Sequence, residues 1–138
     1  MADLYPAVGV GDAVFPILVI PMKCESAVTK GQVVVYNTHT SGELPSVSTA
    51  GANADNVAGV ALKSGGVGEV IPVLVKGVVK VTGTGVITMG NRLVAGANGV
   101  VAAMAADTFT ALQLISRNIG WAMQTFASGD TGLIFIDR

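Results

Sequence analysis

The sequence has 138 residues, of which 51% are apolar, 5% aromatic and 12% charged, and eight basic against nine acidic side chains give a net charge of −1. The length suits one domain with its own core. The single cysteine excludes a disulfide framework and a cysteine-based zinc site, and the scattered charges leave no basic stripe for nucleic acid. So little charge favours an assembled state in which part of the surface lies against another chain.

Residues 1–10, "MADLYPAVGV", form an N-terminal arm without the basic start of a signal peptide. The apolar run "AVFPILVIPM" at Ala13–Met22 is about half as long as a membrane span and contains two prolines. The sequence therefore predicts a soluble protein, made in the cytoplasm, with no membrane partner. Because proline cannot donate to a β ladder, Pro16 and Pro21 indicate an edge strand or a bulge here.

The next segments continue as strands and turns. "VTKGQVVV" at Val28–Val35 is typical of a turn glycine that leads into a strand. The polar stretch Asn37–Asn56 is predicted to be a loop with one short strand near Glu43–Val47. "VIPVLVKGVVKV", from Val70 to Val81, is rich in β-branched residues and predicts a strand with a bend or bulge at Gly77; Pro72 again favours an edge position or a bulge.

Two elements are predicted in the last third of the chain. Asn98 and Gly99 form a hairpin signal between two apolar runs. The segment Ala102–Ser116 is the one helix candidate, because Met104, Phe109, Leu112 and Ile115 fall on one face, although its threonines weaken the pattern.

A repeat organises the whole pattern. "GVALKSGGVGE" at Gly59–Glu69 returns as "GWAMQTFASGD" at Gly120–Asp130, and "VTKGQVVV" returns as "ITMGNRLV". Two copies are too few for a solenoid, so the prediction is a mainly β single domain, residues 11–138, with an internal pseudo-twofold repeat of about 11–68 and 69–138. The turn glycines that define it are Gly11, Gly31, Gly59, Gly68, Gly90, Gly120 and Gly129.

The sequence offers no catalytic constellation. Asp130 begins "DTG", the tripeptide of aspartic proteases, but the repeat explains it as a turn acid equivalent to Glu69, which makes a protease the least favoured function. His39 lies alone in a polar loop and Cys24 is expected to be a half-buried strand residue. Trp121 is expected to fill a core or a subunit interface. We therefore predict no catalytic residues, no metal site, no cofactor and no enzyme activity.

The ordered phrases "VTKGQVVVYN", "VAGVALKSGGVGEVIPVLVKGVVKV", "ITMGNRLVAGANGVV" and "NIGWAMQTFASGDTGLIFI" resemble the capsid decoration, or cement, proteins of tailed viruses that infect bacteria or archaea. The resemblance covers about Gly11 to Ile136. It implies a compact β-barrel or β-tulip domain that assembles as a homotrimer on the outer surface of the icosahedral head, binds the major capsid protein and stabilises the expanded shell against internal pressure.

This resemblance gives the arm a role as a hypothesis. Leu4, Tyr5, Pro6 and Val8 are expected to contact the capsid by strand addition to an exposed sheet edge. The alternative from a different class is another virion or tail component, or a glycan-binding β module, which Trp121 and the polar loop would serve.

Overall fold

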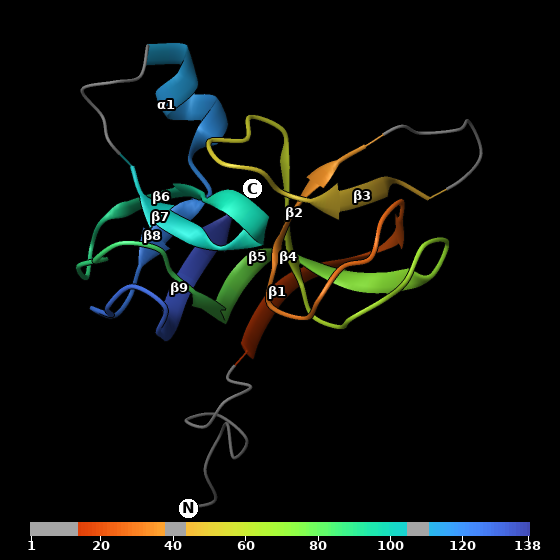
Figure 1. Cartoon of the computed structure of the whole chain (residues 1–138), viewed down its shortest axis with the longest axis horizontal. Helices are drawn as coiled ribbons and strands as arrows, with labels where there is room; N and C mark the ends of the chain where they lie inside the picture. The colour runs from red at the N-terminus through yellow and green to blue at the C-terminus, as the bar shows by residue number, and fades with distance from the viewer. Residues whose placement is uncertain (1–13, 38–43, 105–110) are drawn as a thin grey trace, which may run out of the picture.

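The computed structural model describes residues 14–37, 44–104 and 111–138 (Figure 1). Its strands form one nine-stranded sheet in the order β1-β3-β2-β4-β5-β9-β8-β6-β7, and β1 also pairs with β5. The mainly β prediction is confirmed. The elements are β1 (Val14–Cys24), β2 (Val33–Tyr36), β3 (Ser46–Thr49), β4 (Val57–Ala61), β5 (Val70–Thr82), β6 (Arg92–Ala95), the 3-10 turn η1 (Ala97–Gly99), β7 (Val101–Ala103), α1 (Ala111–Arg117), β8 (Gly120–Ala122) and β9 (Thr131–Asp137).

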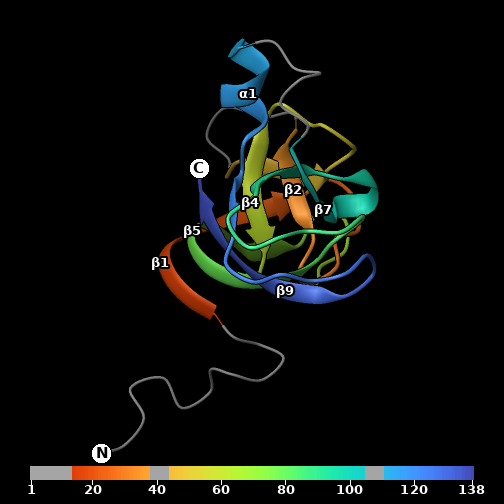
Figure 2. The same ribbon diagram turned by 90° about the vertical axis from the view of Figure 1, so that its left-hand side faces the viewer.

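The long strand β5 joins two rings of strands. In the first ring, β5 pairs with β1 and β4, and the pairings β1–β3, β3–β2 and β2–β4 complete the circuit. In the second, β5 pairs with β9, followed by β8, β6 and β7, and a parallel bridge from Val101 to Gly83 returns to the end of β5. In Figure 1 the first ring, in red-orange to green, lies on the right and the second ring, in green-cyan to blue, on the left; Figure 2 views the molecule from the side of the second ring.

Main-chain hydrogen bonds recur at equivalent positions of the two predicted repeats. Gly31 N–H donates to Ala61 O over 2.8 Å, and Gly90 N–H donates to Ala122 O over the same distance. Both glycines have a φ near +90°, which a residue with a Cβ rarely adopts. Further equivalent pairs are the bridges Val28–Gly65 and Ile87–Phe126, and the bonds Cys24–Glu69 (2.8 Å) and Gly83–Asp130 (3.0 Å).

Each half has an apolar core at equivalent positions. The core of the first ring contains Met22, Val28, Val34, Ala58, Ala61, Ile71, Val73 and Val75. The larger core of the second ring contains Val81, Ile87, Leu93, Ile119, Ala122, Ile134 and Ile136, and it also takes in Val33, Val60 and Leu74 from the first ring. The two rings thus pack against each other through this shared core. We propose the division at residues 68 and 69 as the boundary between the repeats, with β5 opening the second.

In both cores a glycine faces a bulky side chain at equivalent positions, but the two roles are exchanged. In the first ring Gly65 leaves room for Ile71, whose Cγ2 would lie 2.6 Å from a Cβ at that glycine. In the second half the equivalent of Gly65 is Phe126, and its ring lies over Gly132, where an added Cβ would lie 2.6 Å from the Phe126 Cγ and Cε1. A bulky residue on one strand therefore requires glycine on the other.

Replacing Gly132 by isoleucine is expected to cost about 3 kcal/mol, because the new side chain overlaps the Phe126 ring. Phe126→Gly alone is expected to cost about 3–5 kcal/mol through the cavity it leaves. The double variant recreates the Gly65–Ile71 pair of the first ring. It should therefore be at least about 2 kcal/mol more stable than the sum of the two single losses predicts. Urea unfolding of all four proteins measures this difference. Additive losses would contradict the packing argument.

The helix prediction was wrong in its extent. Ala102 and Ala103 belong to β7, which pairs with β6 across the predicted hairpin, and among the described residues the helix covers Ala111–Arg117. Asn98 and Gly99 both have positive φ, of 59° and 75°, and this turn returns the chain to the ladder before a helix begins. Phe109 lies outside the described residues, and Ile115 is exposed.

One end of α1 is attached to the first half of the domain. Arg117 Nε–H donates to Asp55 Oδ1 over 2.7 Å, and the Ser116 hydroxyl donates to the same oxygen over 3.0 Å. These hydrogen bonds lower the pKa of the exposed Asp55 carboxyl, and the bond from Arg117 has the larger effect. The stabilisation that they supply is therefore present at neutral pH and is lost as the pH falls through this lowered pKa.

Other local predictions met mixed outcomes. The short strand of the polar segment is β3, Ser46–Thr49, slightly later than expected. Pro16 lies beside an irregular register between β1 and β5, and Gly77 opposite it has a φ of 140°, as the predicted bend requires. Pro72 is not on an edge strand. Its carbonyl accepts from Leu62 N–H over 3.0 Å, just beyond the end of β4, where its missing donor costs no ladder bond.

Candidate functional site

The residues singled out by the sequence lie in different parts of the chain. Leu4, Tyr5, Pro6, Val8 and Gly11 lie outside the described residues. Of the remaining turn glycines, four have positive φ at loop positions: Gly31, Gly68, Gly90 and Gly129. Gly59 and Gly120 instead lie inside β4 and β8, where a Cβ would collide with the carbonyl groups of Leu74 and Phe135 respectively.

The "DTG" motif belongs to the packing of the repeat. Asp130 is exposed, its N–H donates to Ala127 O over 3.0 Å, and its carbonyl accepts from Gly83. The corresponding bond in the first half joins Glu69 N–H to the carbonyl of Gly66. Since the motif's glycine lies under the Phe126 ring, both ends of the tripeptide have structural explanations that need no catalysis.

Cys24 is more deeply buried than predicted, with 1% of its surface exposed. Burial, and secondarily the charge of Glu69, raise the pKa of its thiol. A thiol in this state is a poor nucleophile at neutral pH. His39 lies outside the described residues. Within residues 14–37, 44–104 and 111–138 there is no cluster of three potential metal ligands and no helix long and apolar enough to cross a membrane.

An aromatic row crosses the outer side of the second half. Register pairs align Arg92 with Trp121, Trp121 with Phe135, and Phe135 with Val78 across neighbouring strands. The Trp121 and Phe135 rings stack with centroids 4.7 Å apart, and the Arg92 guanidinium lies 5.2 Å from the Trp121 centroid. Strands on both sides thus supply contacts to the indole, which leaves little free ring face for a sugar.

The first part of β1 presents an apolar strand edge. One edge of β1 pairs with β5 from Val14 to Lys23, whereas on its other edge the described residues supply a partner strand, β3, only at Lys23 and Cys24. Ile17, Leu18 and Val19 in this part are 64%, 45% and 38% exposed. An exposed apolar strand with an open edge is a ready site for strand addition or for another chain.

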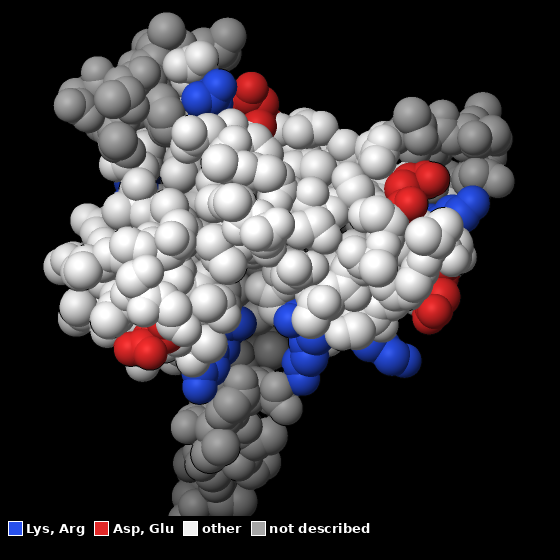
Figure 3. Space-filling view, viewed as in Figure 1, with Lys and Arg blue, Asp and Glu red and all other residues white. Residues whose placement is uncertain are grey.

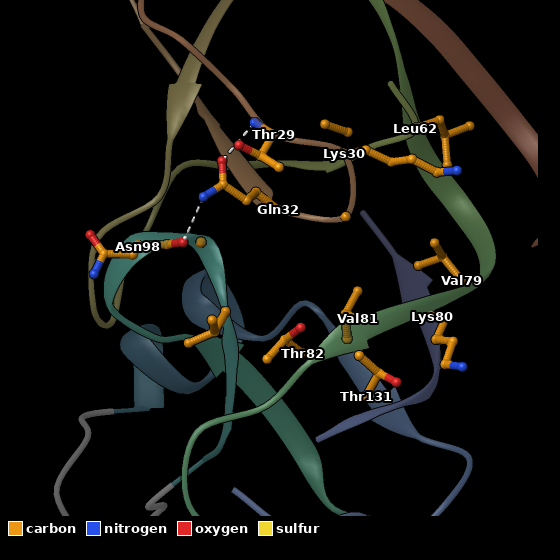
Figure 4. Close-up of a pocket in the computed structure, with 14 residues that line it drawn as sticks. Thr29, Lys30, Gln32, Leu62, Val79, Lys80, Val81, Thr82, Asn98 and Thr131 are labelled. Atoms are coloured by element: carbon orange, nitrogen blue, oxygen red, sulfur yellow. Dashed lines mark hydrogen bonds between the residues drawn. The ribbon is translucent and has the colours of Figure 1, made fainter. Parts of the chain in front are cut away.

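A pocket of about 760 Å³ lies between the two halves (Figure 4). The loop Thr29–Gln32 lines one wall, the end of β5 another and the η1 turn a third. Gln32 fixes this loop: its Oε1 accepts from Thr29 N–H over 2.8 Å, and its Nε2 donates to Asn98 O over 3.0 Å.

Over the face seen in Figure 3 charged side chains are sparse, with several Lys and Arg at its lower edge.

Comparison with known proteins supplies the family. The model of the family described as "Phage cement protein" matches residues 13–137. The chain belongs to the phage cement protein family. Members of this family are structural phage proteins, so this chain is a component of a phage particle.

A solved structure shares the fold of this cement protein. It is the head fiber gp8.5 N base in bacteriophage phi29, with a TM-score of 0.65 and 17% sequence identity; the match covers 87% of this chain and 93% of the other. At this identity the likeness concerns the fold alone. A search among curated proteins gave no match.

Sequence reasoning missed three surfaces of the cement protein: the aromatic row, the open edge of β1 and the pocket. Trp121 was expected to contribute to a core or an interface, but its alignment with Phe135 depends on strand register, which a single sequence does not reveal. The exposed run Ile17–Val19 lies in the apolar segment Ala13–Met22. In the sequence, Pro16 and Pro21 are the features of this segment that indicate a strand edge.

Proposed function

We propose that this cement protein binds the outer surface of the expanded icosahedral capsid through the major capsid protein and stabilises the shell against internal pressure. The family match over residues 13–137 carries the proposal. A protein that binds the expanded shell alone stabilises that state by mass action, and many copies act together. We further propose that it acts as a homotrimer, since few charges cover a chain that is 51% apolar.

The structural support is a surface suited to such contacts. Ile17, Leu18 and Val19 offer apolar area next to an open strand edge, and the rings of packed strands around it form a rigid platform. In the sequence, three residues separate the arm of residues 1–10 from this strand. We propose Leu4, Tyr5, Pro6 and Val8 as the capsid-contacting residues of that arm.

The test mixes the purified protein with expanded, undecorated capsids and, separately, with unexpanded shells. We expect density on the expanded shells by electron microscopy and a higher temperature of capsid rupture. Ile17→Asp should weaken decoration at least tenfold, because it places a charge on the apolar edge. Val86→Asp is the matched control, since Val86 in the other half is 71% exposed, close to the 64% of Ile17. If the wild-type protein does not decorate expanded capsids, the proposal is refuted. Sedimentation of the free protein measures whether it forms a trimer in solution.

A further inference from the structure

The aromatic row of the second ring has a counterpart in the first ring. Strand pairings of the same register align both rows from one strand to the next. Trp121 and its counterpart Val60 each directly follow a glycine of the repeat. The counterparts of Arg92, Trp121 and Phe135 are, in that order, Val33, Val60 and Leu74. The two rows therefore occupy the same place in the two repeats.

The counterpart row is the face by which the first ring packs against the second. Val33, Val60 and Leu74 are fully buried, and all three belong to the core of the second ring. Leu62, the residue that follows β4, also packs against that core. The outer face of the first ring is therefore an interface between two repeats.

The aromatic row itself is less covered. Trp121 and Phe135 are half-buried and Arg92 is exposed. Met123, the counterpart of Leu62, is 42% exposed. The strands of residues 14–37, 44–104 and 111–138 form two rings, so no third described ring lies over this face. Tryptophan, arginine and methionine are enriched at protein interfaces, so this face has both the position and the composition of an interface.

A second surface corresponds to the part of the second ring that lies opposite Leu62. That part is the pocket wall formed by the end of β5, the η1 turn and Thr131. The register of β1 on β5 matches that of β5 on β9, and the parallel pairing of β1 with β3 matches the bridge of Val101 to Gly83. The first ring therefore has its own version of this wall. Its residues are Ile20–Lys23, Leu44–Ser46 and Val70.

This first-ring wall carries exposed apolar side chains. Leu44 is 40% exposed and Val70 is 53% exposed. In the part of the chain that the structure describes, no further ring packs against the wall. In Figure 1, β3 and this wall lie on the right, whereas β8 and the aromatic row lie on the left. One copy therefore presents the two matching surfaces on opposite sides, where a second copy can reach them.

We propose that the aromatic row of one copy packs against the first-ring wall of a second copy. The contact continues the stacking of rings from one chain to the next. A repeat of a second copy is the favoured occupant, because a repeat is what covers the matching face of the first ring. The contact joins two different surfaces, so three copies that each use both surfaces close into a trimer.

The inference rests on the proposed homotrimer and names the surfaces that form it. It does not depend on capsid binding, so the experiments use the free, full-length protein. Leu62 and Thr131 line the same pocket, so their counterparts Met123 and Val70 are expected to face each other in the contact.

Trp121 is the one tryptophan of the sequence, so its fluorescence reports on the aromatic row directly. Sedimentation and acrylamide quenching are measured on the same dilution series. Quenching of Trp121 should increase as the assembly dissociates. Met123→Lys should raise the dissociation constant at least about tenfold, whereas Met123→Leu, which restores the first-ring residue, should preserve association. Val86→Lys is the exposed-site control and should leave association unchanged, since Val86 is 71% exposed and lies in neither surface.

A charge pair tests which surfaces meet. Val70→Asp alone should weaken association as strongly as Met123→Lys does. The double variant places the new lysine opposite the new aspartate at every contact, so it should recover most of the association. Circular dichroism verifies that each variant is folded. If the wild type forms a trimer and both single variants do so equally well, the trimer stands and this interface is wrong. A wild type that stays monomeric at every concentration overturns both.

Discussion

Gly120→Ala is expected to destabilise the protein by about 3 kcal/mol or more, enough to lower the melting temperature by roughly 10 °C. Gly120 has a φ of 145°, and a Cβ there would collide with Phe135 O and lie 2.8 Å from its carbonyl carbon. These are backbone atoms of the paired strand β9, so they cannot move aside without breaking the ladder. Thermal unfolding followed by circular dichroism measures the loss.

Gly51→Ala is the matched control. Gly51 lacks a positive φ and has nothing within 4 Å of a Cβ, so its replacement should change stability by less than about 0.5 kcal/mol. Gly59→Ala should behave like Gly120→Ala, because the repeat places the Leu74 carbonyl against it. Similar small effects at all three positions would mean that the strands are not packed this closely at β4 and β8.

Deletion of residues 2–10 is expected to weaken capsid binding strongly, by about 100-fold, equivalent to about 2.7 kcal/mol. The described strands begin at Val14, so the melting temperature should change by less than about 2 °C. The loss should arise because the arm contributes backbone hydrogen bonds and apolar side chains to the capsid contact. Quantitative decoration of expanded capsids measures it.

A full-length variant separates side chains from chain length. Replacing Leu4, Tyr5 and Val8 by serine should reproduce most of the loss, whereas Ala7→Ser should have little effect. If the truncated protein decorates capsids with undiminished affinity, the arm is not the anchor. The contact would then be sought in the segments Asn37–Asn56 or Ala102–Ser116.

Local signals in the sequence were sufficient for much of the β framework. β-branched runs predicted β1, β2 and β5, and Gly77 predicted the bend that the structure has. The helix was overextended because alanine favours a helix in isolation, while Ala102 and Ala103 gain more from pairing with β6. Cys24 was placed too near the surface because burial depends on how the first ring closes.

The sequence by itself determined the β class, the internal repeat and the resemblance to cement proteins, because glycines at equivalent turns and alternating apolar residues are local requirements that remain visible in the letters. Tertiary structure alone decided that β5 joins both rings, that Phe126 covers Gly132, and that Lys80–Thr82 line a pocket next to the start of β1. These features depend on strand register and on contacts between residues far apart in the chain. Local propensity does not specify such pairings, since a shift of one residue reverses which side chains face the core.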